Sequence, residues 1–196
     1  MPLVTLVILA LVVGSITPQF LSAETLLVLA ADTATLFVLA TGVTFVIMLG
    51  GIDLSIQSMA SLGSVIVALT VAQLGYGAFA LAVAVGALSG LAGGLAHVKL
   101  KIPSFIATLA IGGVLAGTAL VISGARSITL GAAERQYLWW ITGRTIGVPH
   151  EVWIGLVVLL VAHVIQSRTA FGRYSAAIGA GEAAAYASGV KVDRQK

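Results

Sequence analysis

The polar residues of segment 50–55, Gly-Gly-Ile-Asp-Leu-Ser, interrupt an otherwise apolar stretch of the chain. Asp53 can act as a helix N-cap, because its carboxylate accepts hydrogen bonds from free backbone amides and complements the helix dipole. It can also line a path or gate across a membrane, since a carboxylate at membrane depth is costly and tends to face a cavity or a partner. Gly50, Gly51, Asp53 and Ser55 are therefore candidate path residues, and both interpretations of Asp53 stay open.

The other groups that could perform chemistry do not form a catalytic or metal-binding pattern. His97, His150 and His163 are far apart and lack metal-ligand spacing, and the chain has neither a Gly-x-Ser-x-Gly motif nor a phosphate loop. It has no cysteine, which excludes thiolate metal sites and cysteine nucleophiles. The sequence therefore indicates a protein that is not an enzyme and carries no cofactor of its own.

Glycines recur at a spacing of four in two of the apolar stretches. Gly86, Gly90 and Gly94 fall on one face of a predicted helix, and Gly113 and Gly117 do the same on the next one. Glycine faces let membrane helices approach closely and pack by van der Waals contact. We expect these five residues to pack helices within the chain, with a seam between two protomers as the alternative.

The composition determines the environment in which these residues act. Of the 196 residues, 59% are apolar and only 9% are charged, whereas a typical soluble domain is about 25% charged. Mean hydropathy is +1.11, which leaves too little polar surface to cover a soluble globule. The sequence therefore predicts a polytopic membrane protein, and the net charge of +3 describes membrane topology and not a nucleic-acid site.

Uncharged stretches give the membrane spans, because a bilayer core needs about 20 apolar residues per helix. The stretches are continuously apolar and do not alternate, which favours helices over a barrel. The chain is thus predicted to be an all-α membrane protein with about six transmembrane helices. We expect them at residues 3–17, 27–49, 54–73, 78–98, 103–123 and 152–167.

The distribution of Lys and Arg predicts the orientation. Seven basic residues lie on the side of the termini, and three lie on the other side. The seven are Lys99, Lys101, Arg168, Arg173, Lys191, Arg194 and Lys196, and the three are Arg126, Arg135 and Arg144. By the positive-inside rule, both termini are cytoplasmic. Segment 124–151, with its aromatic residues 137–140, is then an outer, partly helical loop at the membrane interface.

The first predicted span has a second interpretation. Residues 1–23 end in Leu-Ser-Ala, which resembles a signal-peptidase site. No Lys or Arg precedes the apolar stretch, however, and the count of basic residues is consistent only if the span is kept. We therefore expect a membrane helix here.

The last 29 residues, 168–196, differ from the rest because they carry five basic and two acidic side chains among small residues. Alanines after Glu182 favour a short helix, and Gly189 is expected to end it. Such a helix can dock a soluble partner, and the basic residues around it can alternatively bind anionic lipid.

Three segments together resemble a known family. Segment 42–55, segment 102–109 (Ile-Pro-Ser-Phe-Ile-Ala-Thr-Leu) and segment 171–179 (Phe-Gly-Arg-Tyr-Ser-Ala-Ala-Ile-Gly) follow one another in the order found in ribose-type permeases of bacterial ABC sugar importers. The chain is identified as similar to this family over nearly its whole length. The family continues into further helices, so the resemblance covers the N-terminal half of a permease or somewhat more. We expect either a fragment or a second half on a separate chain.

The resemblance implies an incomplete importer permease bundle in a bacterial inner membrane, with a transmembrane part at 1–167 and a cytoplasmic coupling loop at 168–196. It implies a monosaccharide as the solute and, as partners, a cytoplasmic ATPase that binds ATP and Mg²⁺, a periplasmic sugar-binding protein, a second permease protomer and membrane lipid. The implied ATPase contacts are Glu182, Ala183, Ala184 and Gly189.

Two other functions stay open on the sequence. One is a half-sized secondary transporter, which would carry a functional charge in the middle of a span, where this chain has none. The other is a membrane subunit that does not itself transport. Binding of a cytoplasmic ATPase through the tail would discriminate the importer permease from both.

Overall fold

Apolar helices make up most of the chain in the computed structural model, which describes residues 2–196 and the side chains from residue 4 onward. Five of these helices are long and apolar enough to cross a membrane. They are α2 (Ala23–Met48), α3 (Ile56–Leu74), α4 (Gly77–Lys99), α5 (Ser104–Ser123) and α8 (His150–Arg168). A sixth, α1 (Pro2–Ile16), is apolar but only 15 residues long, and η1 (Pro18–Leu21) joins it to α2. The prediction of an all-helical membrane protein with about six helices is confirmed.

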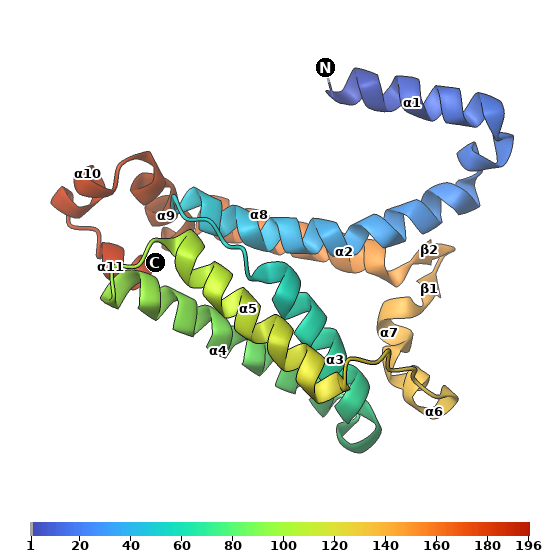
Figure 1. Ribbon diagram of the computed structural model, residues 1–196. Helices are drawn as coiled ribbons and strands as arrows, with labels where there is room; N and C mark the ends of the chain where they lie inside the picture. Colours follow the sequence, from blue (N-terminus) through green and yellow to red (C-terminus); the bar gives the residue numbers. More distant parts are fainter. Residues whose placement is uncertain (1) are drawn as a thin grey trace.

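The long helices form two groups (Figure 1). In the first, α3 packs on both α4 and α5, around a small core of Leu62, Ile66, Leu115 and Ala119. In the second, α8 runs along α2. Most other large apolar side chains are exposed, as Val83 and Val121 illustrate at 72% and 80%. Helices that are apolar all round are typical of a protein surrounded by lipid.

Segment 124–149 joins the two groups at one end, which we refer to as the hairpin end. It contains α6 (Ala132–Arg135), η2 (Gln136–Leu138), α7 (Trp139–Thr142) and a hairpin of β1 (Arg144–Thr145) and β2 (Val148–Pro149). Tyr137 meets Tyr76 edge to face, and Trp140 does the same with Phe79. The predicted partly helical loop is therefore present, and the short hairpin within it was not predicted.

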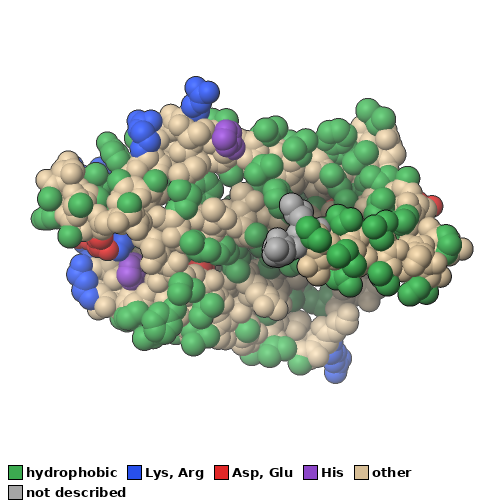
Figure 2. Space-filling view, turned by 90° about the horizontal axis from the view of Figure 1, so that it is seen from above, with side chains coloured by type: hydrophobic (Ala, Val, Ile, Leu, Met, Phe, Trp, Pro, Cys, Tyr) green, Lys and Arg blue, Asp and Glu red, His purple; other side chains and the backbone are tan. Residues whose placement is uncertain are grey.

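The tail lies at the opposite end, the tail end, and folds into α9 (Ala170–Ala180), α10 (Glu182–Ala187) and α11 (Val192–Gln195). The predicted helix after Glu182 is confirmed as α10, and Gly189, with φ of +84°, follows its end. Glycine suits this position because other residues rarely adopt a positive φ. Figure 2 shows Lys and Arg side chains gathered around the tail end, with apolar side chains over the helices.

Candidate functional site

The chain between α2 and α3 is extended and runs along α5, with the side chains of Ile52 and Leu54 exposed. Residues 51–55 have no helical structure, so α3 begins at Ile56 and not at the predicted residue 54. The backbone of Ser55 packs against Gly112, which is eight residues, or about 12 Å, along α5 from its first residue Ser104. Segment 51–55 therefore runs beside the first turns of α5, well inside the tail end.

Two hydroxyl groups of α5 satisfy the backbone of this extended segment. Ser104 Oγ accepts a hydrogen bond of 3.0 Å from the amide of Ile52, and Thr108 Oγ1 accepts one of 3.0 Å from the amide of Leu54. Thr108 Oγ1 also lies 3.2 Å from the carbonyl oxygen of Ile52, to which it can donate. Because backbone groups away from water need partners, these two side chains allow a non-helical segment at this depth.

Asp53 shapes the start of α3 without being its N-cap. Its Oδ1 accepts hydrogen bonds from the amide of Ser55 at 2.7 Å and from the Ser55 hydroxyl at 2.6 Å. The N-cap is Ser55, whose own side chain makes no capping bond. The interpretation of Asp53 as the N-cap is therefore wrong, because the chain stays extended after Gly51 and the N-cap lies two residues later. The Asp53 carboxylate instead stabilises a turn of the backbone next to it.

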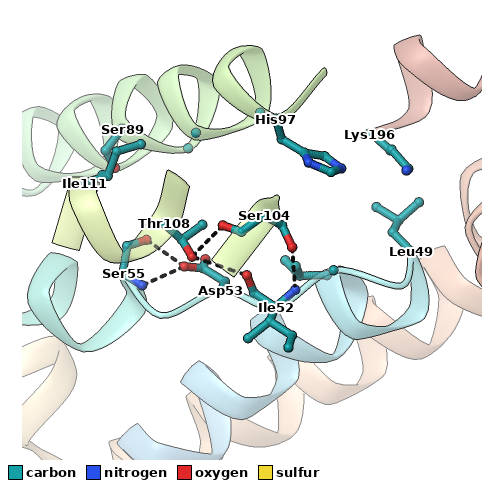
Figure 3. A pocket seen from close by; sticks show the side chains of 15 residues that line it. Leu49, Ile52, Asp53, Ser55, Ser89, His97, Ser104, Thr108, Ile111 and Lys196 are labelled. Carbon is teal, nitrogen blue, oxygen red and sulfur yellow. Dashed lines mark hydrogen bonds between the residues drawn. The ribbon is translucent and has the colours of Figure 1, made fainter. Parts of the chain in front are cut away.

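A cavity of about 180 Å³ lies between segment 51–55, α4 and α5 (Figure 3). Of the candidate path residues, Gly51, Asp53 and Ser55 line it, while Gly50 does not. The polar side chains of Ser89, His97, Ser104, Thr108 and Lys196 contribute to its wall, and Gly90, Gly93 and Gly94 form the wall on α4. The fold thus brings together residues that lie far apart in the sequence.

His97 is oriented in this cavity by a backbone carbonyl. Its Nδ1 lies 2.8 Å from the carbonyl oxygen of Ile102, so Nδ1 carries the hydrogen and donates it. In the neutral ring, Nε2 is then an acceptor. Among the described residues, no group of three or more His, Cys, Asp or Glu could hold a metal ion.

The predicted packing glycines take different places in the structure. A Cβ on Gly86 would meet Met59, and one on Gly94 would lie 3.6 Å from the carbonyl oxygen of Lys196. Gly90, Gly113 and Gly117 would meet no described atom within 4 Å, and their role in packing, within the chain or between two protomers, stays a prediction. The close approaches are made by neighbouring glycines that were not predicted.

These neighbours are Gly93 and Gly112, both of which are buried. A Cβ on Gly112 would lie 3.3 Å from the Cα of Ser55, and one on Gly93 would lie 3.3 Å from Ile111. The spacing of the glycines alone could not identify these two residues. Gly112 and Gly113 lie on different faces of α5, and only the position of segment 51–55 decides which of them makes a close contact. The role of Ser104 and Thr108 was also missed, although their spacing of four residues places both hydroxyls on one helix face.

The tail is attached to the end of α2 through a second close approach. α9 passes so near this end that a Cβ on Gly179 would overlap the carbonyl oxygen of Met48. Ile178 is 2% exposed and packs with Ala185 of α10 and Val192 of α11. Ala185 is the buried residue of α10, while Glu182, Ala183, Ala184 and Tyr186 are exposed. α10 therefore presents most of its surface outward from the tail end.

Glu182 forms an ion pair with Lys196, with 2.7 Å between Oε2 and Nζ. The hydrogen bond from Lys196 lowers the pKa of Glu182 below its ordinary value of 4.5, although the Glu182 side chain is 58% exposed. A carboxyl group whose pKa is lowered in the folded protein stabilises it above the ordinary pKa, and the contribution is lost as the pH falls through the lowered value.

We expect Glu182 to titrate below pH 4.5 and the variant Lys196→Gln to return its pKa to the ordinary range. The measurement is a titration of the Glu182 carboxyl carbon by NMR with selective labelling. Because exposed pairs contribute little to stability, the midpoint of unfolding at neutral pH should change only slightly. An unchanged Glu182 titration in Lys196→Gln would contradict the ion pair.

Comparisons with known proteins agree with the resemblance found in the sequence. Residues 25–196 match the family model described as branched-chain amino acid transport system / permease component. The chain is 36% identical to the ribose import permease protein RbsC of Escherichia coli K12, over 99% of this chain and 62% of the relative. It is 35% identical to RbsC of Bacillus subtilis, over 100% of this chain and 61% of the relative.

The chain is also 34% identical to the autoinducer 2 import system permease protein LsrC of Klebsiella pneumoniae, over 97% of this chain and 56% of the relative. It therefore spans about three fifths of the length of the curated relatives that it matches. No solved structure matches the chain.

Proposed function

The chain belongs to the family of permease components of branched-chain amino acid transport systems, within which it is similar to ribose import permeases, and we propose that it forms the transmembrane path of an ATP-driven ABC importer. The proposed solute is a monosaccharide or a similar small polyhydroxylated molecule, since two of its relatives are named for ribose and autoinducer 2 import. The proposed location is a bacterial inner membrane, with both termini in the cytoplasm.

The observation that carries this proposal is the extended segment 51–55 with the cavity beside it. Non-helical backbone at membrane depth is tolerated where it is buried in protein or lines a water-filled cavity. Transporters use interrupted helices of this kind to build solute and ion sites inside the membrane. A purely structural membrane subunit has no need for hydroxyl groups that hold a helix interruption open, whereas a permease needs a polar surface inside the bilayer.

The tail supports coupling to a cytoplasmic ATPase. α10 is anchored through Ala185 while Glu182 and Tyr186, at 58% and 74% exposure, face outward. Exposed tyrosines are frequent anchors of protein interfaces. We propose that Glu182, Ala183, Ala184 and Gly189 form the docking surface for the ATPase, with ATP and Mg²⁺ bound in that partner. Residues 1–167 then form the transmembrane part and residues 168–196 the coupling loop.

Movement of the docked α10 can reach the solute path through α9. α9 lies against the end of α2, and a Cβ on Gly179 would come within 3.7 Å of the amide nitrogen of Gly50, directly before the extended segment. A rigid shift of the tail would thus move segment 51–55. We propose a second permease protomer as the other wall of the path and a periplasmic binding protein that delivers the solute at the hairpin end.

Uptake and partner binding test the proposal in the full-length permease. Glu182→Ala should weaken binding of the cognate ATPase at least tenfold, measured by co-purification at graded concentrations, and should lower ATP-dependent uptake of D-ribose in membrane vesicles. The matched control is Glu134→Ala, which removes a partly exposed carboxylate from the short helix α6 at the opposite end. Equal ATPase binding by both variants would refute the docking assignment, and the absence of ATP-dependent uptake by the unmodified protein would refute the sugar importer function.

A further inference from the structure

The glycine-rich face of α4 packs on its neighbours at Gly86 and Gly93 and, at Gly90 and Gly94, borders a solute-sized cavity. Gly90, Gly93 and Gly94 line this cavity, and a Cβ on Gly90 would meet no described atom within 4 Å. We propose that the cavity is a transient binding site for a neutral polyhydroxylated solute inside the permease. This inference rests on the proposed transport function and adds the site, its contacts and the class of molecule that it accepts.

The cavity is open because glycines form its wall on α4. Three of the residues on the α4 wall are glycines, and a Cβ added at Gly90 would meet none of the described atoms within 4 Å. Binding sites for drug-sized molecules are typically about 300–1,000 Å³. A cavity of about 180 Å³ is smaller, and it suits a solute the size of a monosaccharide or less. Any larger side chain at position 90 would extend into this space.

The polar groups that segment 51–55 and α4 contribute to the cavity are hydrogen-bond acceptors. Ser55 bonds only to Oδ1 of Asp53, and among the described residues the second carboxylate oxygen has no hydrogen-bond partner. His97 leaves Nε2 as an acceptor, because Nδ1 donates to Ile102. Ser89 donates its hydrogen to the carbonyl of Gly86 at 2.8 Å, so its oxygen can still accept. Figure 3 shows Ser89 and His97 on α4, across the cavity from Asp53.

Donors come from Ser104 and from Lys196, whose ammonium lines the cavity and keeps two hydrogens beyond the one that it donates to Glu182. Ser104 Oγ accepts from the amide of Ile52, and within the described residues its own hydrogen has no acceptor, so it can donate to a solute. A polyhydroxylated molecule donates several hydrogen bonds and accepts others, so it can pair with both the acceptors and the donors that line the cavity. Its C–H groups can pack on Ile111 and on the glycine wall.

The charge in the cavity discriminates between classes of solute. Asp53 would repel an anion, because the charges would meet in a region of low dielectric constant, and the Lys196 ammonium that also lines the cavity is already paired with Glu182. A small cation is less suitable than a polyol, since the Asp53 carboxylate is already stabilised by two hydrogen bonds from Ser55. A neutral solute with several hydroxyl groups uses the acceptors without burying another charge.

Thiol labelling tests occupancy of the cavity directly. Because the chain has no cysteine, Gly90→Cys gives a single thiol with no background, provided that the rest of the full-length protein is also kept free of cysteine. In vesicles, D-ribose at saturating concentration should slow the reaction of this thiol with a small methanethiosulfonate reagent at least fivefold. Ser188→Cys, on the exposed end of the tail, is the control, and its reaction rate should not change.

The outcomes of the labelling experiment separate the classes of solute. An unchanged rate of Gly90→Cys labelling in D-ribose would overturn the proposed site. Equal or stronger protection by methylammonium would overturn the assignment to a neutral polyol. Both labelling rates report binding of the solute alone, so they do not depend on coupling to ATP hydrolysis.

A steric variant links the site to transport. Gly90→Leu should lower ATP-dependent D-ribose uptake at least tenfold, because its side chain fills the cavity. Gly117→Leu is the matched control: Gly117 also has open space around it but lies on α5 and does not line the cavity, so uptake should stay within twofold. Equal uptake by the two variants would refute the site, whereas no uptake by the unmodified permease would refute the proposed function instead.

Discussion

Gly179→Ala is expected to detach the tail from the transmembrane helices and to destabilise this region by about 3 kcal/mol. The added Cβ would overlap the carbonyl oxygen of Met48, which belongs to the last residue of α2 and cannot move as a flexible side chain could. Overpacking of well-packed sites commonly costs about 1–3 kcal/mol, and a clash with backbone lies at the upper end of this range. Ile178 would be displaced with it, so the small core of the tail would open.

Limited proteolysis of the full-length permease in vesicles measures this effect. Cleavage within residues 168–196 should be at least tenfold faster in Gly179→Ala than in the unmodified protein. Gly181→Ala is the matched control, since a Cβ there would lie 3.8 Å from the nearest side chain and its φ of 176° is extended backbone that alanine adopts. Equal cleavage rates in the two variants would contradict the close approach of α9 to α2.

Removing the two hydroxyl groups that hold segment 51–55 is expected to have the second large effect. Ser104→Ala leaves the amide of Ile52 without its partner, and Thr108→Val does the same to the amide of Leu54. In the membrane, a backbone donor left without a partner away from water costs about 1–3 kcal/mol, so each variant should lower the free energy of unfolding by this amount. The double variant should lower it by less than the sum if Ile52 and Leu54 are released together.

Hydrogen exchange of individual amides identifies the cause of the loss. The amides of Ile52 and Leu54 should exchange at least tenfold faster in the respective variants, while the core of α3 around Leu62 keeps its protection. Thr118→Val is the matched control on the same helix, because the Thr118 hydroxyl bonds within α5, to the carbonyl of Val114. Thr108→Ser, which keeps the hydroxyl, should restore the exchange rate. Unchanged exchange at Leu54 in Thr108→Val would show that the hydroxyl is not its partner.

The Gly179→Ala variant and the hydroxyl variants affect the two ends of segment 51–55. Segment 51–55 is held by α5 at its inner end and adjoins the contact between α9 and α2 at its outer end. If the proposed coupling is correct, each change should also reduce solute transport without reducing membrane insertion.

Much of the fold was predictable because the lipid environment imposes a simple rule on the sequence. Long uncharged stretches gave the helices to within a few residues, and the order of three motifs indicated the permease family, which the match over residues 25–196 confirms. The short helix after Glu182 followed from its alanines and from the glycine that ends it. These features depend on local composition, and each can be evaluated within one segment of chain.

The candidate site depends on contacts between segments, and here local patterns were insufficient. Gly90 and Gly94 share their spacing with Gly86, yet only the position of segment 51–55 makes their face a cavity wall. Asp53 is adjacent to a helix start in the sequence, but the extended backbone moves the cap to Ser55.

The sequence by itself therefore determined the membrane environment and the helices, because hydrophobicity and backbone propensity act locally, and its resemblance to ribose-type permeases in three segments indicated the family. Only the tertiary structure decided which glycines make close contacts, which hydroxyls satisfy segment 51–55 and where a cavity opens. Those properties follow from the way in which three helices meet around an interruption, since a hydrogen bond between residues 52 and 104 exists only after both segments have been placed.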